Sequence, residues 1–586
     1  MAEEKVFYGI PVSPGIASGK IFVFDHEDDT VVERDITEEE IPLEIVKLEN
    51  ALIETRREIT EIKKKIAESI GLSHAEIFSA HLLVLEDRTF LEEIIKEVEA
   101  NKKSVDFVFQ SIMEKYIRAF SEIEDEYLKE RMSDIQDVGK RVLHHLMGKK
   151  RKDLSTLEEE VVVVAFDLSP SDTALMHKDN VIGFATDIGG KTSHTAIMAR
   201  SIGIPAVVGL HNISQKVKTG EEAIIDGNKG IVYISPSEET RRIYTDKKFQ
   251  FLDYERHLES VKDLPAETKD GKVFTLYANI EIPEDIPSII SHGARGIGLY
   301  RTEFIYMNRT DLPSEEEQYI AYRKAAEAMH PKSVVIRTMD MGGDKFLSHL
   351  QLPKEMNPFL GWRAIRFCLA RPDIFKIQLK AILRASEFGN VKLMYPMISG
   401  INEIKQSNEI LEEAKAELKK EGRAFDEKIP VGAMVEIPSA ALTADIMARY
   451  VAFFSIGTND LIQYSLAVDR VNEKIAYLYD PAHPAVLRLI KYIIDTGHKA
   501  GIPVSMCGQM AGDPASVVFL VGMEIDELSM SPFSIPEVKL LIRNMEFAEM
   551  KKAVEEAMTL ETPEEINALA NRYVEKYLPE IFQYRF

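Results

Sequence analysis

The sequence predicts a multidomain α/β protein whose C-terminal half is a (β/α)8 TIM barrel. Three observations lead to this prediction. Short apolar runs separated by Gly, Pro and Ser occupy residues 7–24 and 158–235, whereas residues 36–149 nearly lack Gly and Pro and show helical spacing. From Lys272 onward, strand-like and helix-like segments alternate. A chain of 586 residues has room for about three or four domains.

The N-terminal part is expected to combine strands with an inserted group of helices. Strand-rich residues 1–25 should pack with residues 150–235 in one α/β domain, which also contains one good helix near residues 192–202. Residues 26–149 should form an inserted helical subdomain, because apolar residues recur at helical spacing in segments such as LEIVKLENALIETRREITEIKKKIAESI. The polar, charged residues 236–262 predict a helical linker.

Residues 263–586 contain eight strand-like runs, and helical stretches follow most of them. The runs are VFTLYA, GIGLY, VVIRT, VKLMYP, GAMVE, AFFSI, PVSMC and ELSMS. Eight such units fit a (β/α)8 barrel, with a doubly wound open sheet as the alternative. Because barrel enzymes carry their chemistry at the C-terminal ends of the strands, a barrel predicts reactive residues after these runs.

Reactive side chains do follow these runs. They are Arg301, Arg337, Glu436, Asn459, Asp460 and Cys507, with Arg470 a little further on. Guanidinium groups bind carboxylate and phosphate through a planar fork of donors, and carboxylates are suitable ligands for Mg²⁺. The set therefore predicts a site for a dense anion and a divalent metal ion, where phosphoryl transfer depends on positioning and charge neutralisation.

Alternatives stay open for the individual residues. A single arginine is more often a partner in a surface ion pair, and only the shared placement at strand ends favours a site. Cys507 ends an apolar strand, so it is as consistent with buried packing as with a thiol that exchanges a proton at a site mouth.

A second candidate centre is the segment GGKTSHTAIMAR, residues 189–200. Its glycines allow a sharp turn before a helix that begins near Thr192, and a helix N-terminus favours a phosphate. His194 lies in the first turn, where a neutral imidazole can carry a phosphoryl group and Thr192 can orient the ring. A histidine that only caps or packs near a helix start is the alternative.

Composition narrows the partners and the location. A net charge of −24 argues against nucleic acid or an anionic membrane as the main partner, but suits a basic protein. No apolar run approaches the ~20 residues that span a bilayer, and MAEEKVFYGI lacks the features of a signal peptide. The two cysteines, Cys368 and Cys507, cannot build a disulfide framework. We therefore expect a cytoplasmic protein.

The motifs together resemble Enzyme I of the bacterial phosphotransferase system, a phosphoenolpyruvate–protein phosphotransferase, over essentially the whole chain. The resemblance rests on GGKTSHTAIMARSIGIPAVVG, GIGLYRTEF, VIRTMDMGGDK, NPFLGWRAIR, FFSIGTNDLIQYSLAVDR, and MCG before AGD. It implies a swivelling phosphohistidine domain, a helical subdomain that docks the small carrier protein HPr, and a barrel that binds phosphoenolpyruvate and forms a homodimer. The implied reaction moves phosphate from phosphoenolpyruvate to the enzyme's own histidine and then to HPr, releasing pyruvate.

The resemblance also implies a role for each candidate residue. His194 corresponds to the histidine phosphorylated on Nε2, and Cys507 to the thiol that protonates enolpyruvate. Glu436 and Asp460 correspond to Mg²⁺ ligands. The groups that hold the substrate are Arg301, Arg337, Asn459, Asp460 and Arg470. The candidate contacts with HPr are His81, Glu86, Arg131 and Asp134.

One position departs from the family pattern, which usually has a glutamate two residues after the cysteine. Here that residue is Gln509, which cannot carry a negative charge. We expect altered protonation at Cys507 with phosphate binding intact; alternatively, Gln509 keeps the hydrogen bonds and little changes. Two other function classes have less support. A phosphoenolpyruvate synthase or dikinase would need an ATP-binding domain, and a non-catalytic scaffold would not need His194.

Overall fold

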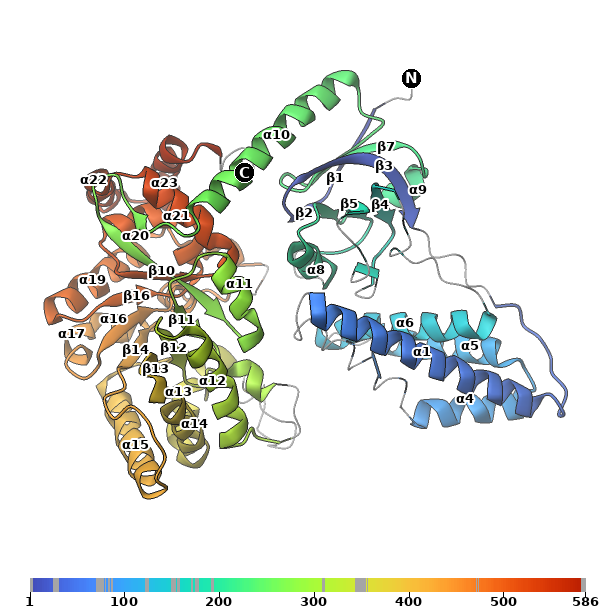
Figure 1. Ribbon diagram of the computed structural model, residues 1–586, viewed down its shortest axis with the longest axis horizontal. Helices are drawn as coiled ribbons and strands as arrows, with labels where there is room; N and C mark the ends of the chain where they lie inside the picture. The colour runs from blue at the N-terminus through green and yellow to red at the C-terminus, as the bar shows by residue number, and fades with distance from the viewer. Residues whose placement is uncertain are drawn as a thin grey trace. The chain divides into compact units, whose positions relative to one another are not determined.

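A computed structural model divides the chain into two compact units, Met1–Asp253 and Tyr254–Phe582 (Figure 1). The described residues are 4–24, 31–69, 78, 81–82, 85, 88–121, 126–148, 154, 157, 159–169, 172–173, 176, 179–190, 194–307, 311–342, 355, 357–470, 472 and 474–580.

An eight-stranded mixed sheet forms the centre of the first unit. Its strands are β1 (Lys5–Tyr8), β2 (Ile10–Ser13), β3 (Ile16–Phe24), β4 (Val161–Ala165), β5 (Val181–Thr186), β6 (Ala206–Val208), β7 (Glu222–Asp226) and β8 (Ile231–Ile234). Their order is β1-β8-β7-β3-β4-β5-β6-β2. β3 runs parallel to β4 and antiparallel to β7, so a strand from the N-terminus lies between two strands that follow the helical insertion.

Apolar side chains cover both faces of this sheet. Helix α8 (His194–Ile202) packs on one face with Val163 and Phe184, and α9 (Ile213–Lys216) packs on the other with Val164 and Val207. β4 is buried along its whole length, as expected for a strand whose sequence VVVVA is apolar on both sides. The predicted α/β fold is confirmed.

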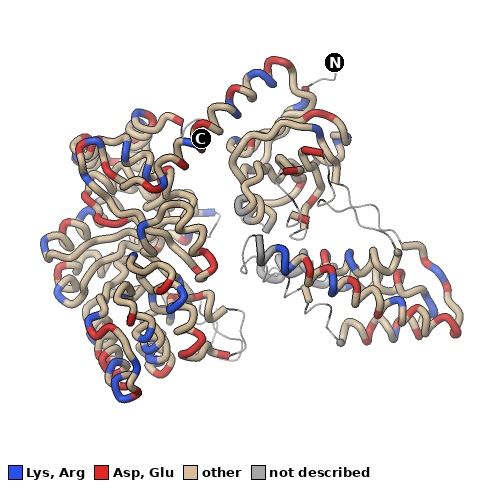
Figure 2. Tube along the Cα trace, in the orientation of Figure 1, with Lys and Arg blue, Asp and Glu red and all other residues tan. Residues whose placement is uncertain are grey.

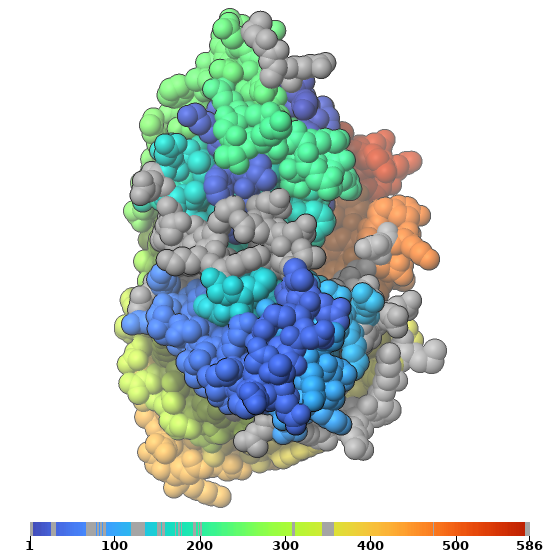
Figure 3. All heavy atoms as spheres, turned by 90° about the vertical axis from the view of Figure 1, so that its right-hand side faces the viewer, coloured from blue at the N-terminus to red at the C-terminus, as the bar shows by residue number. Residues whose placement is uncertain are grey.

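The inserted segment is helical. Its helices are α1 (Ile41–Ser69), α4 (Arg88–Asn101), α5 (Val105–Ser121) and α6 (Glu126–Met147). Their apolar faces share one core, which contains Ile59, Ile94 and Val98, and Figure 3 shows these helices in blue as one packed body. Met198 of α8 belongs to the same core, so packing connects the insertion to the sheet domain.

Helix α10 (Glu238–Val261) follows β8 and carries charged residues of both signs along its length (Figure 2). Near its start, Tyr244 is buried against Ile16 and Ile224 of the sheet. Like every other helix in the described part of the chain, α10 is not both long and apolar enough to cross a membrane.

The second unit is a closed barrel of eight parallel strands. They are β10 (Val273–Ile280), β11 (Ile297–Tyr300), β12 (Val334–Arg337), β13 (Val391–Tyr395), β14 (Val431–Val435), β15 (Phe453–Ile456), β16 (Val504–Met506) and β17 (Glu527–Met530). β10 pairs with both β11 and β17, which closes the barrel and excludes the open sheet. All eight predicted strands are confirmed, and the two-residue β9 (Ala266–Glu267) adds an antiparallel pairing to β10.

Helices surround the barrel (Figure 1). They are α11 (Ile286–Ser291), α12 (Glu315–Met329), α13 (Ala364–Ala370), α14 (Pro372–Ala385), α15 (Ile401–Lys420), α16 (Pro438–Leu442), α17 (Ala444–Met447), α18 (Thr458–Leu466), α19 (Pro484–Ala500), α20 (Pro514–Gly522), α21 (Ile535–Asn544), α22 (Phe547–Ala557) and α23 (Pro563–Tyr577). Local sequence fixes several starts: the Ser314 hydroxyl accepts from the Glu317 amide, and the Glu317 carboxylate accepts from the Ser314 amide.

A buried lysine fixes the C-terminal end of α10 to the barrel. Lys539 of α21 is 1% exposed, and its ammonium group donates to the Lys262 carbonyl and, at 3.2 Å, to the Gly293 carbonyl. Burial, and then the charge of Arg295, lowers the pKa of Lys539 to about 8. An ordinary lysine has a pKa near 10.4.

This pKa predicts a stability that rises with pH. Between about pH 8 and pH 10.5, Lys539 is protonated in the unfolded chain but mostly neutral in the folded chain. Burying this side chain therefore costs less free energy as the pH rises. Relative to Lys539→Met, the wild type should gain about 1–2 kcal/mol in the free energy of unfolding from pH 7.5 to 9.5. Urea unfolding followed by the single tryptophan, Trp362, measures this gain. Exposed Lys420→Met is the control, and a difference that does not change with pH would refute the prediction.

Candidate active site

Seven predicted residues meet in one pocket of the barrel unit. The pocket has a volume of about 250 Å³ and lies where the barrel strands end. Its lining contains Arg301, Arg337, Glu436, Asn459, Asp460, Arg470 and Cys507. Six of them lie at or just after the ends of β11, β12, β14, β15 and β16, and Arg470 follows α18. Residues that are far apart in the sequence therefore meet at the strand ends, as the barrel prediction required.

Three further charged residues line the pocket and were not predicted individually: Glu303, Asp340 and Arg363. Asp340 accepts from Arg337 at 2.7 Å and from Arg363 at 3.0 Å, and Glu303 accepts from Arg337 at 2.9 Å and from the Asp340 amide at 3.0 Å. All three residues lie in motifs that carry the family resemblance. The signal that could have found Glu303 and Asp340 is a charged residue two or three positions beyond a strand-end arginine, whereas no such signal marks Arg363.

This network holds two guanidinium groups that are largely buried. Burial raises the pKa of Asp340, but the charges of Arg337 and Arg363 outweigh burial and hold it below its usual value. Burial raises the pKa of Glu303 above its usual value, and the positive charge of Arg337 opposes this rise only in part. The Nε groups of Arg337 and Arg363 are buried and have no hydrogen-bond partner among the described residues. Four arginines line the pocket in all, so the pocket is suited to an anion.

Glu436 and Asp460 supply two carboxylates to the same pocket. Burial, followed by repulsion from Asp340 and Asp460, raises the pKa of Glu436 well above its usual value. Burial and then Asp340 also raise the pKa of Asp460. The Glu436 carboxylate accepts from the Met397 amide at 2.5 Å and packs against bare backbone, because a Cβ at Gly457 would lie 2.6 Å from Glu436 Oε2.

The remaining polar residues are held more loosely. Arg301 donates to Glu281 at 3.0 Å, and Arg470 lies 4.0 Å from Asp460. Asn459, in the first turn of α18, accepts from the Gln509 amide at 3.0 Å through Oδ1, which leaves its amide nitrogen for another acceptor. The N-terminus of α18 therefore brings both an amide side chain and the positive end of a helix dipole to the pocket.

The position of Cys507 is compatible with both interpretations that the sequence left open. It is 4% exposed and packs with Leu299 and Met434, yet it lines the pocket. The Ser455 hydroxyl donates to its sulfur at 3.3 Å. Burial raises the pKa of the thiol above its usual value, and the bond from Ser455 opposes this only in part. The group is therefore protonated at neutral pH and able to donate a proton.

Gln509 has a different environment from the one expected. Its side chain is exposed and does not line the pocket, and its backbone amide holds Asn459. This arrangement favours the alternative interpretation, in which the change from glutamate to glutamine has little effect on the chemistry at Cys507.

The second predicted centre is described only in part. His194 is the first residue of α8, so its backbone occupies a helix N-terminus; its side chain and the whole of Thr192 lie outside the described residues. Among the candidate docking residues, Glu86 lies outside the described residues, and Arg131 and Asp134 are helical in α6 without a described side chain.

His81 needs a correction. It was predicted to contact a partner at the surface, but its side chain is fully buried in the helical insertion. It lies 3.9 Å from Asp137 and packs edge-on against Phe78. Its described neighbours Phe78 and Leu85 belong to the apolar core of the insertion, so burial in that core is the physical reason.

The environment of Cys507 leads to a testable pH dependence. Because the thiolate is the form that reacts and burial disfavours it, alkylation of Cys507 by iodoacetamide should have a pH midpoint above the ordinary thiol value of about 8.5. Ser455→Ala removes a donor to the sulfur and should move the midpoint to still higher pH. Peptide mass spectrometry distinguishes Cys507 from Cys368; a midpoint at or below the ordinary value would show that the thiol is not held neutral.

Comparisons with known proteins agree with this architecture. Models of phosphoenolpyruvate-utilising enzymes match the chain in three places: the N-terminal domain at residues 8–131, the mobile domain at 157–230 and the phosphoenolpyruvate-binding domain at 255–547. A phosphoenolpyruvate-protein phosphotransferase of Staphylococcus aureus (strain MRSA252) is 44% identical over 97% of this chain and 100% of the relative. One of Listeria monocytogenes serovar 1/2a is 46% identical over 98% and 100%.

A solution structure of an Enzyme I protein covers 42% of this chain and 99% of its own, with 45% identity and a TM-score of 0.37. The family models cover more than half of the chain, and the two relatives extend over almost all of it. The chain belongs to the family of phosphoenolpyruvate-protein phosphotransferases.

Proposed function

We propose that the barrel pocket binds phosphoenolpyruvate and that the chain transfers its phosphoryl group to Nε2 of His194, and then to the histidine of HPr. The observation that carries this proposal is the set of four arginines that line one pocket, two of them held by Asp340, beside two carboxylates with raised pKa values. Phosphoenolpyruvate offers two anionic groups to such donors, and Arg301, Arg470 and Asn459 supply further contacts.

The acidic pair is suited to Mg²⁺. Within the described residues no three His, Cys, Asp or Glu side chains converge as metal ligands, but Mg²⁺ commonly takes one or two carboxylates and completes its shell with water and substrate oxygens. Glu436 and Asp460 would hold it, and their mutual repulsion is the kind of strain a cation relieves. When bound, the ion would neutralise charge on the phosphoryl oxygens.

The chain's own residues supply the rest of the reaction. The arginines fix the phosphate in the pocket. His194 then attacks the phosphorus atom while the bond between phosphorus and the enol oxygen breaks, and the electron pair of that bond stays on enolpyruvate. The Cys507 thiol then gives its proton to the terminal carbon, which yields pyruvate and a thiolate that regains a proton from solvent. Transfer requires His194 to reach the bound phosphate, and the amides at the start of α8 would support the phosphohistidine.

The partner and assembly are part of the same proposal. Acidic residues of the helical insertion suit a basic surface on HPr, with Glu86, Arg131 and Asp134 as contact candidates. Homodimerisation would use the barrel unit, and a cytoplasmic location fits two cysteines that are both free and buried.

Labelling from phosphoenolpyruvate tests the carrier residue. With ³²P-phosphoenolpyruvate and Mg²⁺ but no ATP, the wild type should take up acid-labile, base-stable label and lose it when HPr is added. His194→Ala should take up none, whereas exposed His257→Ala should behave like the wild type. An unlabelled wild type would instead support a non-catalytic scaffold, and label that requires ATP would support a dikinase.

The raised carboxyl pKa values predict how metal affinity depends on pH. Because Glu436 and Asp460 hold protons to higher pH than ordinary carboxyls, a divalent ion must displace them, so affinity should rise as pH increases from 5 to 8. Mn²⁺ can stand in for Mg²⁺, with free Mn²⁺ followed by its paramagnetic resonance signal in the absence of substrate. Glu436→Gln should weaken binding by about tenfold or more. Equal affinity at every pH in the wild type would contradict the assignment.

A further inference from the structure

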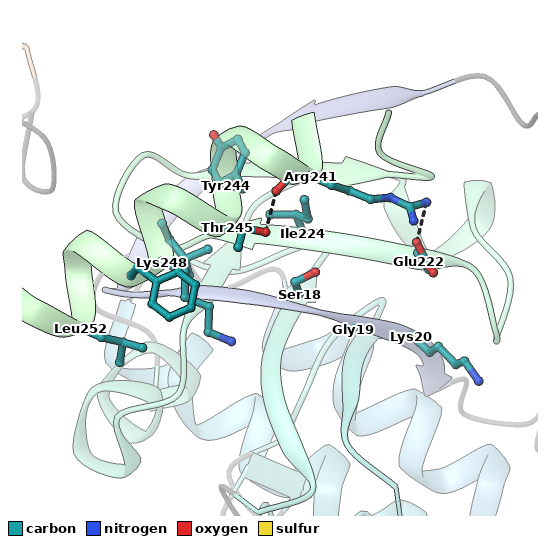
Figure 4. A pocket seen from close by; sticks show the side chains of 12 residues that line it. Ser18, Gly19, Lys20, Glu222, Ile224, Arg241, Tyr244, Thr245, Lys248 and Leu252 are labelled. Carbon is teal, nitrogen blue, oxygen red and sulfur yellow. Dashed lines mark hydrogen bonds and ion pairs between the residues drawn. The ribbon is translucent and has the colours of Figure 1, made fainter. Parts of the chain in front are cut away.

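A groove on the first unit lies apart from the residues of the proposed reaction. It runs between α10 and the strands β3 and β7, and its volume is about 510 Å³ (Figure 4). Small-molecule sites typically measure roughly 300–1,000 Å³. All of its lining residues belong to the first unit, and no role in phosphoryl transfer has been given to any of them.

The floor of the groove is apolar. Ile16 of β3 and Ile224 of β7 pack with Tyr244 of α10, which is only 5% exposed. Further along the helix, Phe249 and Leu252 line the groove but remain 69% and 38% exposed. Covering this surface would release water from apolar area, which favours a ligand with an apolar body.

The rim of the groove is cationic. Lys20, Arg241 and Lys248 line it together with a single carboxylate, Glu222. Arg241 lies 2.6 Å from Glu222, so that pair is satisfied internally, as the dashed line in Figure 4 shows. Lys20 and Lys248 have no ion-pair partner within the described ranges of the chain. Two lysines without partners beside one groove, in a chain of net charge −24, make a local site for negative charge.

Hydroxyl groups complete the polar side. Figure 4 shows Ser18 on β3 between the two lysines, and Thr245 faces it from α10. The Thr245 hydroxyl donates to the Arg241 carbonyl at 2.8 Å, which leaves its oxygen able to accept. Apolar floor, cationic rim and nearby hydroxyls are the three components of a site for an amphipathic anion.

We propose that this groove binds a small organic anion with an aromatic or compact apolar body and one acidic head group. The body covers Tyr244, Phe249 and Leu252, and the head group accepts charge-assisted hydrogen bonds from Lys20 and Lys248. A ligand in this position contacts the sheet and α10 at once, so it ties the helix to the strands beneath it.

The test uses 8-anilinonaphthalene-1-sulfonate, an aromatic anion that brightens in apolar surroundings, titrated into the full chain. Lys20→Glu combined with Lys248→Glu should weaken binding roughly tenfold or more, because two charge-assisted bonds become repulsions. Thr245→Trp should reduce binding by filling the groove. Arg242→Glu, an equal charge change outside the lining of the groove, should stay within about twofold of wild type. Thermal unfolding of each variant verifies that it is folded.

Competition with the dye distinguishes the contribution of the ligand's acidic head group from that of its apolar body. Phenyl phosphate should displace the dye, whereas benzyl alcohol and inorganic phosphate at the same concentration should do so poorly. The proposal is overturned if the double lysine variant and Thr245→Trp both bind like the wild type. It is also overturned if benzyl alcohol displaces the dye as well as phenyl phosphate does, because the groove would then be an apolar patch only. Equal displacement by inorganic phosphate would overturn it too, because the groove would then be a charge cluster only.

Discussion

The organisation of the barrel pocket depends on Asp340. Its carboxylate accepts from both Arg337 and Arg363, and its side chain is only 6% exposed. Buried charges are stable only when they are paired and hydrogen-bonded, so this carboxylate allows two largely buried guanidinium groups to line the pocket. Without it, the arginines would turn toward solvent or repel each other, and the anion site would lose its fixed geometry.

Charge balance explains why substrate and metal should arrive together. The pocket contains four arginines and four carboxyls, and two of the carboxyls, Glu436 and Asp460, have raised pKa values that favour the neutral form. Burial and repulsion make these two carboxyls hold protons to higher pH than ordinary carboxyls, and a divalent cation can replace such protons while the arginines receive the anion. Close packing supports this arrangement: a Cβ at Gly508 would lie 1.8 Å from Thr458 Oγ1, so β16 meets the first turn of α18 through bare backbone.

Much of this structure follows from sequence pattern, and the exceptions have physical causes. Eight strand-like runs predicted the barrel strands, and the strand-end rule found seven residues of the pocket. Arg363 was missed because no strand-like run in the sequence directly precedes it. The burial of His81 and the outward side chain of Gln509 depend on tertiary packing, which a local pattern does not encode. The groove beside α10 likewise exists only once the helix lies on the sheet, because its lining comes from residues 16–20, 222–224 and 241–252.

The most direct test of the central claim is the affinity of Asp340→Asn for phosphoenolpyruvate, measured by isothermal titration calorimetry with Mg²⁺. Two effects of this substitution have opposite signs. If Asp340 acts by holding Arg337 and Arg363, the affinity should fall by about tenfold or more, since one of the two oxygens that accept from these arginines becomes an NH2 group, which cannot accept. Exposed Asp445→Asn removes the same charge elsewhere and should change little. If Asp340→Asn binds as tightly as the wild type, or more tightly because a negative charge has left the site, the positioning role is contradicted.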